Sequence, residues 1–241
     1  MAALEQQGDL SDRDEAVVQL VAKFRQMTRA QIGDSLFSGN ASATPLDRTL
    51  KRLLERKHLS RLRRLVGGDQ GGSAQYVYQL GREGWRLADR AGTYWAPHAV
   101  NLHTLAIADC YVQLHRGARR GELEVLEFVT EPDSHQSVGN LLLTPDAYVE
   151  TGARPKQTRF SYWLEVDRGT EHPSTIEEKC ERYWSAYQRW AHEFYPRVLF
   201  VVPDQRRKTL ISKSVEYLAP DTHEIFSVCL QGEDICRSML I

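Results

Sequence analysis

The first third of the chain carries apolar residues at the three- and four-residue spacing of amphipathic helices. Val17, Leu20 and Phe24 follow this spacing, and Ser11 before them is a suitable N-cap residue. Thr28 can cap a second, shorter pattern, whereas Thr44 and Pro45 open a third that is rich in leucine. The pattern therefore predicts three helices, over residues 11–27, 28–37 and 44–58.

The hydrophobic period changes after the third predicted helix. Residues 59–66 and 73–80 are short β-like runs, and the glycine-rich stretch GGDQGG between them favours a turn between two strands. A further helix is expected over 82–92, with Gly92 as its C-terminal stop. Three helices followed by a β-hairpin is the element order of a winged helix-turn-helix, so residues 12–95 are predicted to form that domain.

The remainder of the chain predicts an α/β (α+β) domain over residues 100–241, after a linker that contains Pro97. Alternating strand patterns are mixed with helical ones in the order α-β-β-β-α-β, which favours a mixed sheet with helices on its faces. The expected helices cover 101–119, 174–195 and 205–218, and the expected strands cover 122–130, 141–150, 159–167, 197–202 and 224–230.

Composition narrows the class of protein without identifying it. The 241 residues include 26% charged residues, and no apolar run approaches the roughly 18 residues of a membrane span. The acidic N-terminus has no apolar segment typical of a secretory signal. The four cysteines show no zinc-ligand spacing, so we expect reduced thiols in a cytoplasmic protein without a membrane partner.

Charge is distributed unevenly along the chain. Residues 1–95 hold 15 Lys and Arg against 11 Asp and Glu, whereas residues 96–241 hold 16 against 21. A basic segment of this kind suits double-stranded DNA, because a basic helix can enter the major groove while its flanks meet phosphates. A solvated helix face is the alternative explanation. The candidate DNA-binding residues are Arg48, Lys51, Arg52, Arg56 and Lys57 on the third helix and Arg61, Arg63 and Arg64 on the strand after it.

Carboxylates gather on two strands of the second predicted domain. Asp146 lies on the strand over 141–150, and Glu165 and Asp167 share one face of the strand over 159–167. Three converging carboxylates need a proton or a hard cation such as Mg²⁺, and Lys179 on the next helix could add a positive charge. The alternative is structural, with Asp146 in a turn and the other two paired with Arg168 or Arg182 at the surface.

These residues carry a resemblance to known proteins. Pro145-Asp146 followed by Glu165-Val166-Asp167 resembles the PD-(D/E)XK nuclease superfamily. More narrowly, the stretches LTPDAYVE, WLEVDRGTE and RVLFVVPD, with the GG..GG..YVY pattern, resemble the actinobacterial plasmid replication-relaxation family over roughly residues 12–230. The resemblance implies a winged helix-turn-helix joined to a restriction-endonuclease-like domain, and a role in plasmid or mobile-element DNA maintenance.

The resemblance also implies roles for individual residues. Asp146 and Glu165 would hold Mg²⁺ or Mn²⁺, Asp167 would assist, and Lys179 would replace the motif lysine, because Asp167 stands at that position. We therefore expect a DNA-binding protein of plasmid replication or mobilisation. The resemblance also allows metal-dependent nicking or cleavage of DNA by the second domain. One alternative is a non-catalytic replication or transcription regulator whose second domain dimerises or binds a partner. The other is an adaptor that contacts replication or transfer proteins through the aromatic helix over 174–195.

Overall fold

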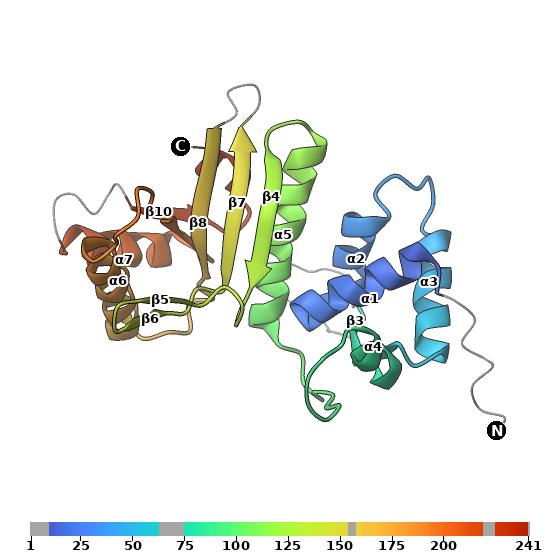
Figure 1. Ribbon diagram of the computed structural model, residues 1–241. Helices are drawn as coiled ribbons and strands as arrows, with labels where there is room; N and C mark the ends of the chain where they lie inside the picture. Colours follow the sequence, from blue (N-terminus) through green and yellow to red (C-terminus); the bar gives the residue numbers. More distant parts are fainter. Residues whose placement is uncertain (1–9, 63–74, 154–157, 219–224, 241) are drawn as a thin grey trace. The chain divides into compact units, whose positions relative to one another are not determined.

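The computed structural model describes residues 10–62, 75–153, 158–218 and 225–240 (Figure 1). The chain divides into two compact units, Met1–Val112 and Gln113–Ile241, and the division falls inside one helix. Among the described residues, no helix is long and apolar enough to cross a membrane.

Short-range capping positions the helices of the first unit. Helices form at all three predicted places, but the first ends at Phe24 rather than at residue 27, because Gln26–Thr28 form a strand, and the third ends at Glu55 rather than at residue 58. The Ser11 hydroxyl accepts a hydrogen bond from the Asp14 N–H at 3.2 Å, and Thr28 forms a capping box with Gln31. The third helix differs at its start, because Ala43 rather than Thr44 is its N-cap residue. The elements of this unit are α1 (Asp12–Phe24), β1 (Gln26–Thr28), α2 (Arg29–Leu36), α3 (Thr44–Glu55), β2 (Leu59–Arg61), β3 (Val77–Leu80) and α4 (Arg82–Leu87).

A small antiparallel sheet closes the first unit. Its strand order is β1-β3-β2, so the central strand β3 pairs with the strand after α1 and with the strand after α3. All four residues of β3 are buried, as expected for a strand with neighbours on both sides. The predicted GGDQGG turn lies outside the described residues, as do Arg63 and Arg64.

The segment predicted to be a linker is bonded to the first unit. The buried Gln26 side chain donates to the Ala99 carbonyl at 3.0 Å and accepts from the Asn101 N–H at 2.7 Å. Gln79 donates to the Pro97 carbonyl at 3.0 Å. The predicted helix stop at Gly92 is also displaced, because α4 ends at Leu87.

The second unit is built on a five-stranded mixed sheet, which confirms the predicted fold class. The strand order is β10-β9-β8-β7-β4, with β10, β9 and β8 parallel and with β7 antiparallel to both of its neighbours. The elements are α5 (Leu102–Arg119), β4 (Glu124–Thr130), β5 (Gln136–Val138), β6 (Leu141–Leu143), β7 (Ala147–Ala153), β8 (Thr158–Val166), α6 (Pro173–Gln188), β9 (Arg197–Val202), α7 (Gln205–Glu216), β10 (Phe226–Leu230) and α8 (Ile235–Ser238).

The single strand predicted over 141–150 is in fact two strands. Leu141–Leu143 pairs with Gln136–Val138 in a separate hairpin, and Ala147–Ala153 enters the main sheet. Pro145 lies between them. Proline has no N–H to donate, so it fits between two strands, where no hydrogen bond of the sheet is lost. The break places Asp146 immediately before β7 rather than within a strand as predicted.

The two faces of the main sheet carry different helices. Trp163 of β8 and Phe200 of β9 share a buried apolar cluster with Ile176 and Tyr183 of α6 and Ile211 of α7. On the opposite face, Thr151 of β7 donates to the Met239 carbonyl, next to α8. Because alternate strand residues point to opposite faces, Glu165 lies on the same face as Trp163, beneath α6.

Candidate functional site

Glu165 is the centre of the predicted acidic site. It lies near the end of β8 with 2% of its surface exposed, and both carboxylate oxygens are hydrogen-bonded. Lys179 Nζ donates to Oε2 at 2.9 Å, and the Tyr183 hydroxyl donates to Oε1 at 2.5 Å. Lys179 and Tyr183 are one helical turn apart on α6, so both reach the carboxylate from the same side of that helix. Lys179 also contacts Glu171 at 3.3 Å.

Asp146 completes the group from the neighbouring strand. Its Oδ2 accepts a hydrogen bond of 2.7 Å from the N–H of Val166, so the side chain of one strand holds the end of the next. Asp146 and Lys179 are both partly exposed, whereas Glu165 lies buried beneath them. The structure therefore brings Asp146, Glu165 and Lys179 together.

Burial and charge shift the pKa values of this group. Burial raises the pKa of Glu165 to about 7, with a contribution from Asp146, against the opposing effects of Lys179 and Tyr183. Burial alone would lower the pKa of Lys179, but Glu165 and Glu171 raise it above its ordinary value. Burial and Glu165 raise the pKa of the Tyr183 hydroxyl, which therefore stays protonated as a hydrogen-bond donor.

Asp167 has a separate partner that the sequence did not indicate. The Arg207 guanidinium at the start of α7 binds both of its oxygens, and the Gly169 N–H donates to Oδ1 at 2.8 Å. Arg207 also donates to the Glu171 carbonyl at 2.8 Å. Asp167 and Arg207 are both buried, so Asp167 pairs with Arg207 rather than with the predicted Arg168 or Arg182.

These contacts compensate the charges that Mg²⁺ was expected to compensate. Lys179 lies against Glu165 and Arg207 lies against Asp167, while both oxygens of Glu165 already accept hydrogen bonds. Within the part of the chain that the structure describes, the three carboxylates do not form a group whose oxygens all lie within 4.8 Å of one another. The arrangement therefore does not fit a divalent cation unless Glu165 exchanges a partner.

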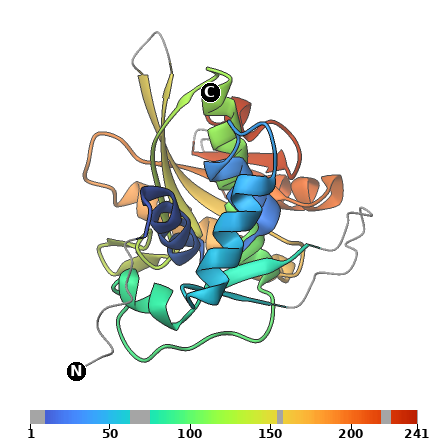
Figure 2. The same cartoon turned by 90° about the vertical axis from the view of Figure 1, so that its right-hand side faces the viewer.

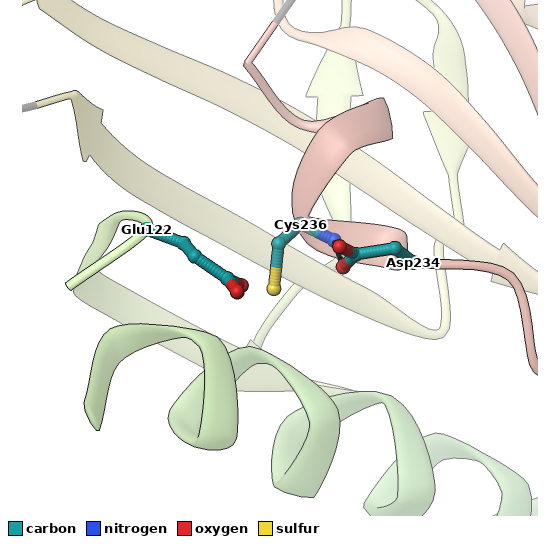
Figure 3. A group of neighbouring side chains, drawn as sticks. All are labelled: Glu122, Asp234 and Cys236. Atoms are coloured by element: carbon teal, nitrogen blue, oxygen red, sulfur yellow. Dashed lines mark hydrogen bonds between the residues drawn. The ribbon is translucent and has the colours of Figure 1, made fainter. Parts of the chain in front are cut away.

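A different group of ligand atoms was not predicted. Glu122, Asp234 and Cys236 offer two carboxylates and a thiol within 4.8 Å of one another, with Glu122 reaching toward the sulfur from beyond α5 (Figure 3). Arg120 holds the Glu122 carboxylate through contacts of 2.6 and 2.7 Å. Burial, Asp234 and Glu122 raise the pKa of the Cys236 thiol to about 12. A protonated thiol is a poor ligand for Mg²⁺, which prefers oxygen.

The predicted DNA-binding residues separate into two groups. The side chain of Arg52 forms an ion pair with the buried Asp14 of α1, with contacts of 2.5 and 2.9 Å, and so fastens α3 to α1. The remaining described members are exposed: Arg48 and Lys51 on α3, Arg56 and Lys57 just after it, and Arg61 on β2. Figure 2 shows α3 in light blue, toward the viewer.

A groove of about 500 Å³ runs between α3 and the small sheet. Its walls include Lys51 and Leu54 of α3 and Arg61, whose guanidinium stacks at 3.9 Å from the centre of the Tyr76 ring. Arg29 also lines the groove and pairs with Asp47 at 2.8 Å. The groove thus combines cationic and aromatic side chains on one surface.

Comparison with known proteins gives one family match. A family model described as replication-relaxation matches residues 18–198. No curated protein matches the chain. Among solved structures, the restriction endonuclease FokI bound to DNA is similar at a TM-score of 0.32 and 11% identity, over 97% of this chain and 47% of that chain. The chain thus spans about half the length of that structure.

Proposed function

Because the chain belongs to the replication-relaxation family, we propose that it is a DNA-binding protein of plasmid or mobile-element replication or mobilisation. Residues 12–95, which form most of the first unit, are the duplex-binding module in this proposal. The observation that carries it is the exposure of Lys51 and Arg61 on the walls of the groove between α3 and the small sheet, together with the exposed Arg48 one helical turn before Lys51.

The architecture of the first unit supports a winged helix-turn-helix. Three helices precede a β2–β3 pair, and β1 between α1 and α2 adds the third strand. In such modules the third helix enters the major groove and the hairpin contacts the adjacent backbone. The exposed side of α3 and the start of the hairpin are the places where Arg48, Lys51 and Arg61 lie.

The test is the salt dependence of duplex binding by the full chain. Fluorescence anisotropy with labelled duplex DNA at several salt concentrations should give a log–log slope that reflects phosphate contacts. The double variant Arg48→Ala with Lys51→Ala should bind about tenfold more weakly and reduce the slope by about two. Lys213→Ala on α7 is the matched control, because Lys213 is exposed on the other unit. Salt-independent binding, or equal affinity of both variants, would contradict the proposal.

Metal-dependent nicking is the second candidate function. The observation in its favour is that Lys179 bonds to Glu165 and that Asp146 lies close enough to Glu165 to affect its pKa. The paired state of Glu165 counts against it. A bound divalent cation would act as a Lewis acid toward a phosphate, and Asp146 with Glu165 would be its ligands.

Nicking of supercoiled plasmid with Mg²⁺ or Mn²⁺ decides between these functions. Relaxation by the wild type that is lost in Asp146→Ala, Glu165→Gln and Lys179→Met would establish the enzyme. Plasmid that is bound but never nicked would favour the non-catalytic regulator, whose second unit contacts a partner. Folding of each variant is checked by thermal unfolding, because these residues also hold the core.

A further inference from the structure

A pocket of about 410 Å³ opens on the face of the main sheet that carries α6. Its floor is formed by paired strand residues, Val129 of β4, Tyr148 of β7 and Trp163 of β8. The segment after β4 and the segment after α6 form its walls. Among the described residues that line it, none belongs to the predicted catalytic set. The volume lies within the range of small-ligand sites in proteins.

The polar groups of this pocket lack partners of opposite charge. Glu127 and Asp133 both line it, and within the described residues neither carboxylate forms an ion pair or hydrogen bond. Nε2 of His135, on the same wall as Asp133, is buried and has no hydrogen-bond partner among the described residues. A ligand that supplies several N–H donors and a positive charge would satisfy both carboxylates, and it would also satisfy Nε2 of His135 in the tautomer whose proton is on Nδ1.

Four of the residues that line the pocket are aromatic, and the ring of Trp190 is held in place. Trp190 packs edge-on against Trp163 at 5.8 Å, and its indole N–H donates to the Phe194 carbonyl at 2.8 Å. Phe194 itself is 79% exposed at the rim. Fixed aromatic faces attract a cation placed over them, and an exposed phenylalanine at a pocket rim gains from being covered.

We propose that this pocket binds an arginine side chain of a partner protein. The guanidinium group is planar, so it stacks on an aromatic ring while its five donors reach carboxylates in the plane. Glu127 and Asp133 would accept from it, and Trp190 or Phe194 would lie against its face. This inference goes beyond DNA binding, because the pocket belongs to the second unit.

Charge favours arginine over a nucleobase, the other planar group that stacks on aromatic rings. Residues 113–241 hold 16 Lys and Arg against 20 Asp and Glu. The described residues lining the pocket include no Lys or Arg, and they include two carboxylates. A base would bring its own phosphates close to these carboxylates, at an electrostatic cost that an arginine side chain avoids.

The experiment uses the full chain and a short blocked peptide, Gly-Arg-Gly, with tryptophan fluorescence and NMR chemical shifts as readouts. The control peptide carries citrulline, which has nearly the same shape as arginine but no charge. We expect saturable binding of the arginine peptide with a Kd on the order of 1 mM or below, as suits a ligand of few atoms. The citrulline peptide should bind at least about tenfold more weakly.

Variants locate the binding site. The double variant Glu127→Gln with Asp133→Asn should bind the arginine peptide at least about tenfold more weakly, and Phe194→Ala should bind it severalfold more weakly. Glu216 is an exposed carboxylate on α7, and Glu216→Gln should leave the affinity for the arginine peptide unchanged. Duplex affinity should not fall in any of these variants, which separates this inference from DNA binding by the first unit.

Three results would overturn the inference. One is equal binding of the arginine and citrulline peptides, and another is no binding of either up to about ten times the expected Kd. The third is tight binding of oligothymidylate that is lost in Phe194→Ala and strengthened by Glu127→Gln, which would assign the pocket to a nucleobase. All of the substituted side chains are exposed, so the variants are expected to fold, and circular dichroism checks this.

Discussion

Lys179 on α6 donates a hydrogen bond of 2.9 Å to Glu165 on β8, across 14 residues of sequence. The same carboxylate accepts from Tyr183, so α6 is fastened to the sheet by two polar contacts inside an otherwise apolar interface. Breaking one side of such a buried pair leaves an uncompensated charge, which costs more than the pair contributes. The contact is therefore a structural element whether or not it also serves catalysis.

Replacing Lys179 by methionine should test that structural role. The substitution keeps most of the apolar stem but leaves Glu165 without its cation. We expect the free energy of unfolding to fall by about 3 kcal/mol at pH 8, measured by urea denaturation. The loss should be smaller at pH 5, where Glu165 takes up a proton. Lys213→Met, at an exposed position of α7, should change stability little, and an equal loss in both variants would contradict the role of the pair.

The raised pKa of Glu165 predicts a pH dependence of stability. Its pKa is about 7 in the folded protein against 4.5 for the unperturbed group, so the folded state holds this proton more tightly. Protonation of Glu165 therefore makes its full contribution to the free energy of unfolding below about pH 4.5, and this contribution is lost as the pH rises through 7. It amounts to at most about 3 kcal/mol. Comparing wild type with Glu165→Gln isolates it, and parallel stability curves would show that Glu165 does not titrate in this range.

Two arginines of α3 should respond in opposite ways to substitution. Arg52→Ala removes the ion pair with Asp14, which is only 3% exposed, and should lower the free energy of unfolding by about 1–3 kcal/mol. Arg48→Ala should leave stability within about 0.5 kcal/mol, because the side chain is exposed, and should weaken duplex binding instead. Thermal unfolding and anisotropy on both variants check this, and a reversed outcome would reassign the two residues.

Gly84 is predicted to be intolerant of any side chain. A Cβ at this position would collide with the backbone carbonyl of His58, where α4 packs against the turn before β2. Gly84→Ala should therefore destabilise the first unit by about 1–3 kcal/mol, as overpacking does. Gly39→Ala meets nothing within 4 Å and is the matched control. Thermal unfolding of the two variants makes the comparison, and equal melting temperatures would be inconsistent with the close approach.

Elements set by local pattern could be predicted, whereas contacts set by strand order could not. The helix over Asp12–Phe24 follows from its cap and apolar spacing, both of which are readable in the sequence. The partner of Asp167 is Arg207, which lies 40 residues away. It becomes a neighbour because β8 and β9 are adjacent and parallel, so the segments after them leave the sheet at the same edge. Without the sheet order, the nearer Arg168 was an equally good choice.

The sequence pattern also did not show that the apolar run over 141–150 contains two strands. The leucines of β6 and the alternating residues of β7 read as one strand, because the bend at Pro145 leaves the apolar content almost continuous. The pocket beside Trp190 could not be predicted from the sequence for a related reason. Its walls come from segments without regular spacing, and only the folded chain brings Glu127 and Asp133 to one cavity.

The hydrogen bonds that join residues 97–101 to the first unit determine where the chain can be cut into stable fragments. Gln26 and Gln79 are both buried and bond to this segment, and Gln31 continues the contact by donating to the Leu105 carbonyl and to Asp109 of α5 at 2.8 and 2.7 Å. A fragment that stops at residue 95 would leave the amides of Gln79 and Gln31 without these acceptors, and the Gln26 amide with only its 3.4 Å contact to Gln79. A protease should accordingly spare Pro97 and Asn101, although the sequence around them resembles an exposed cleavage site.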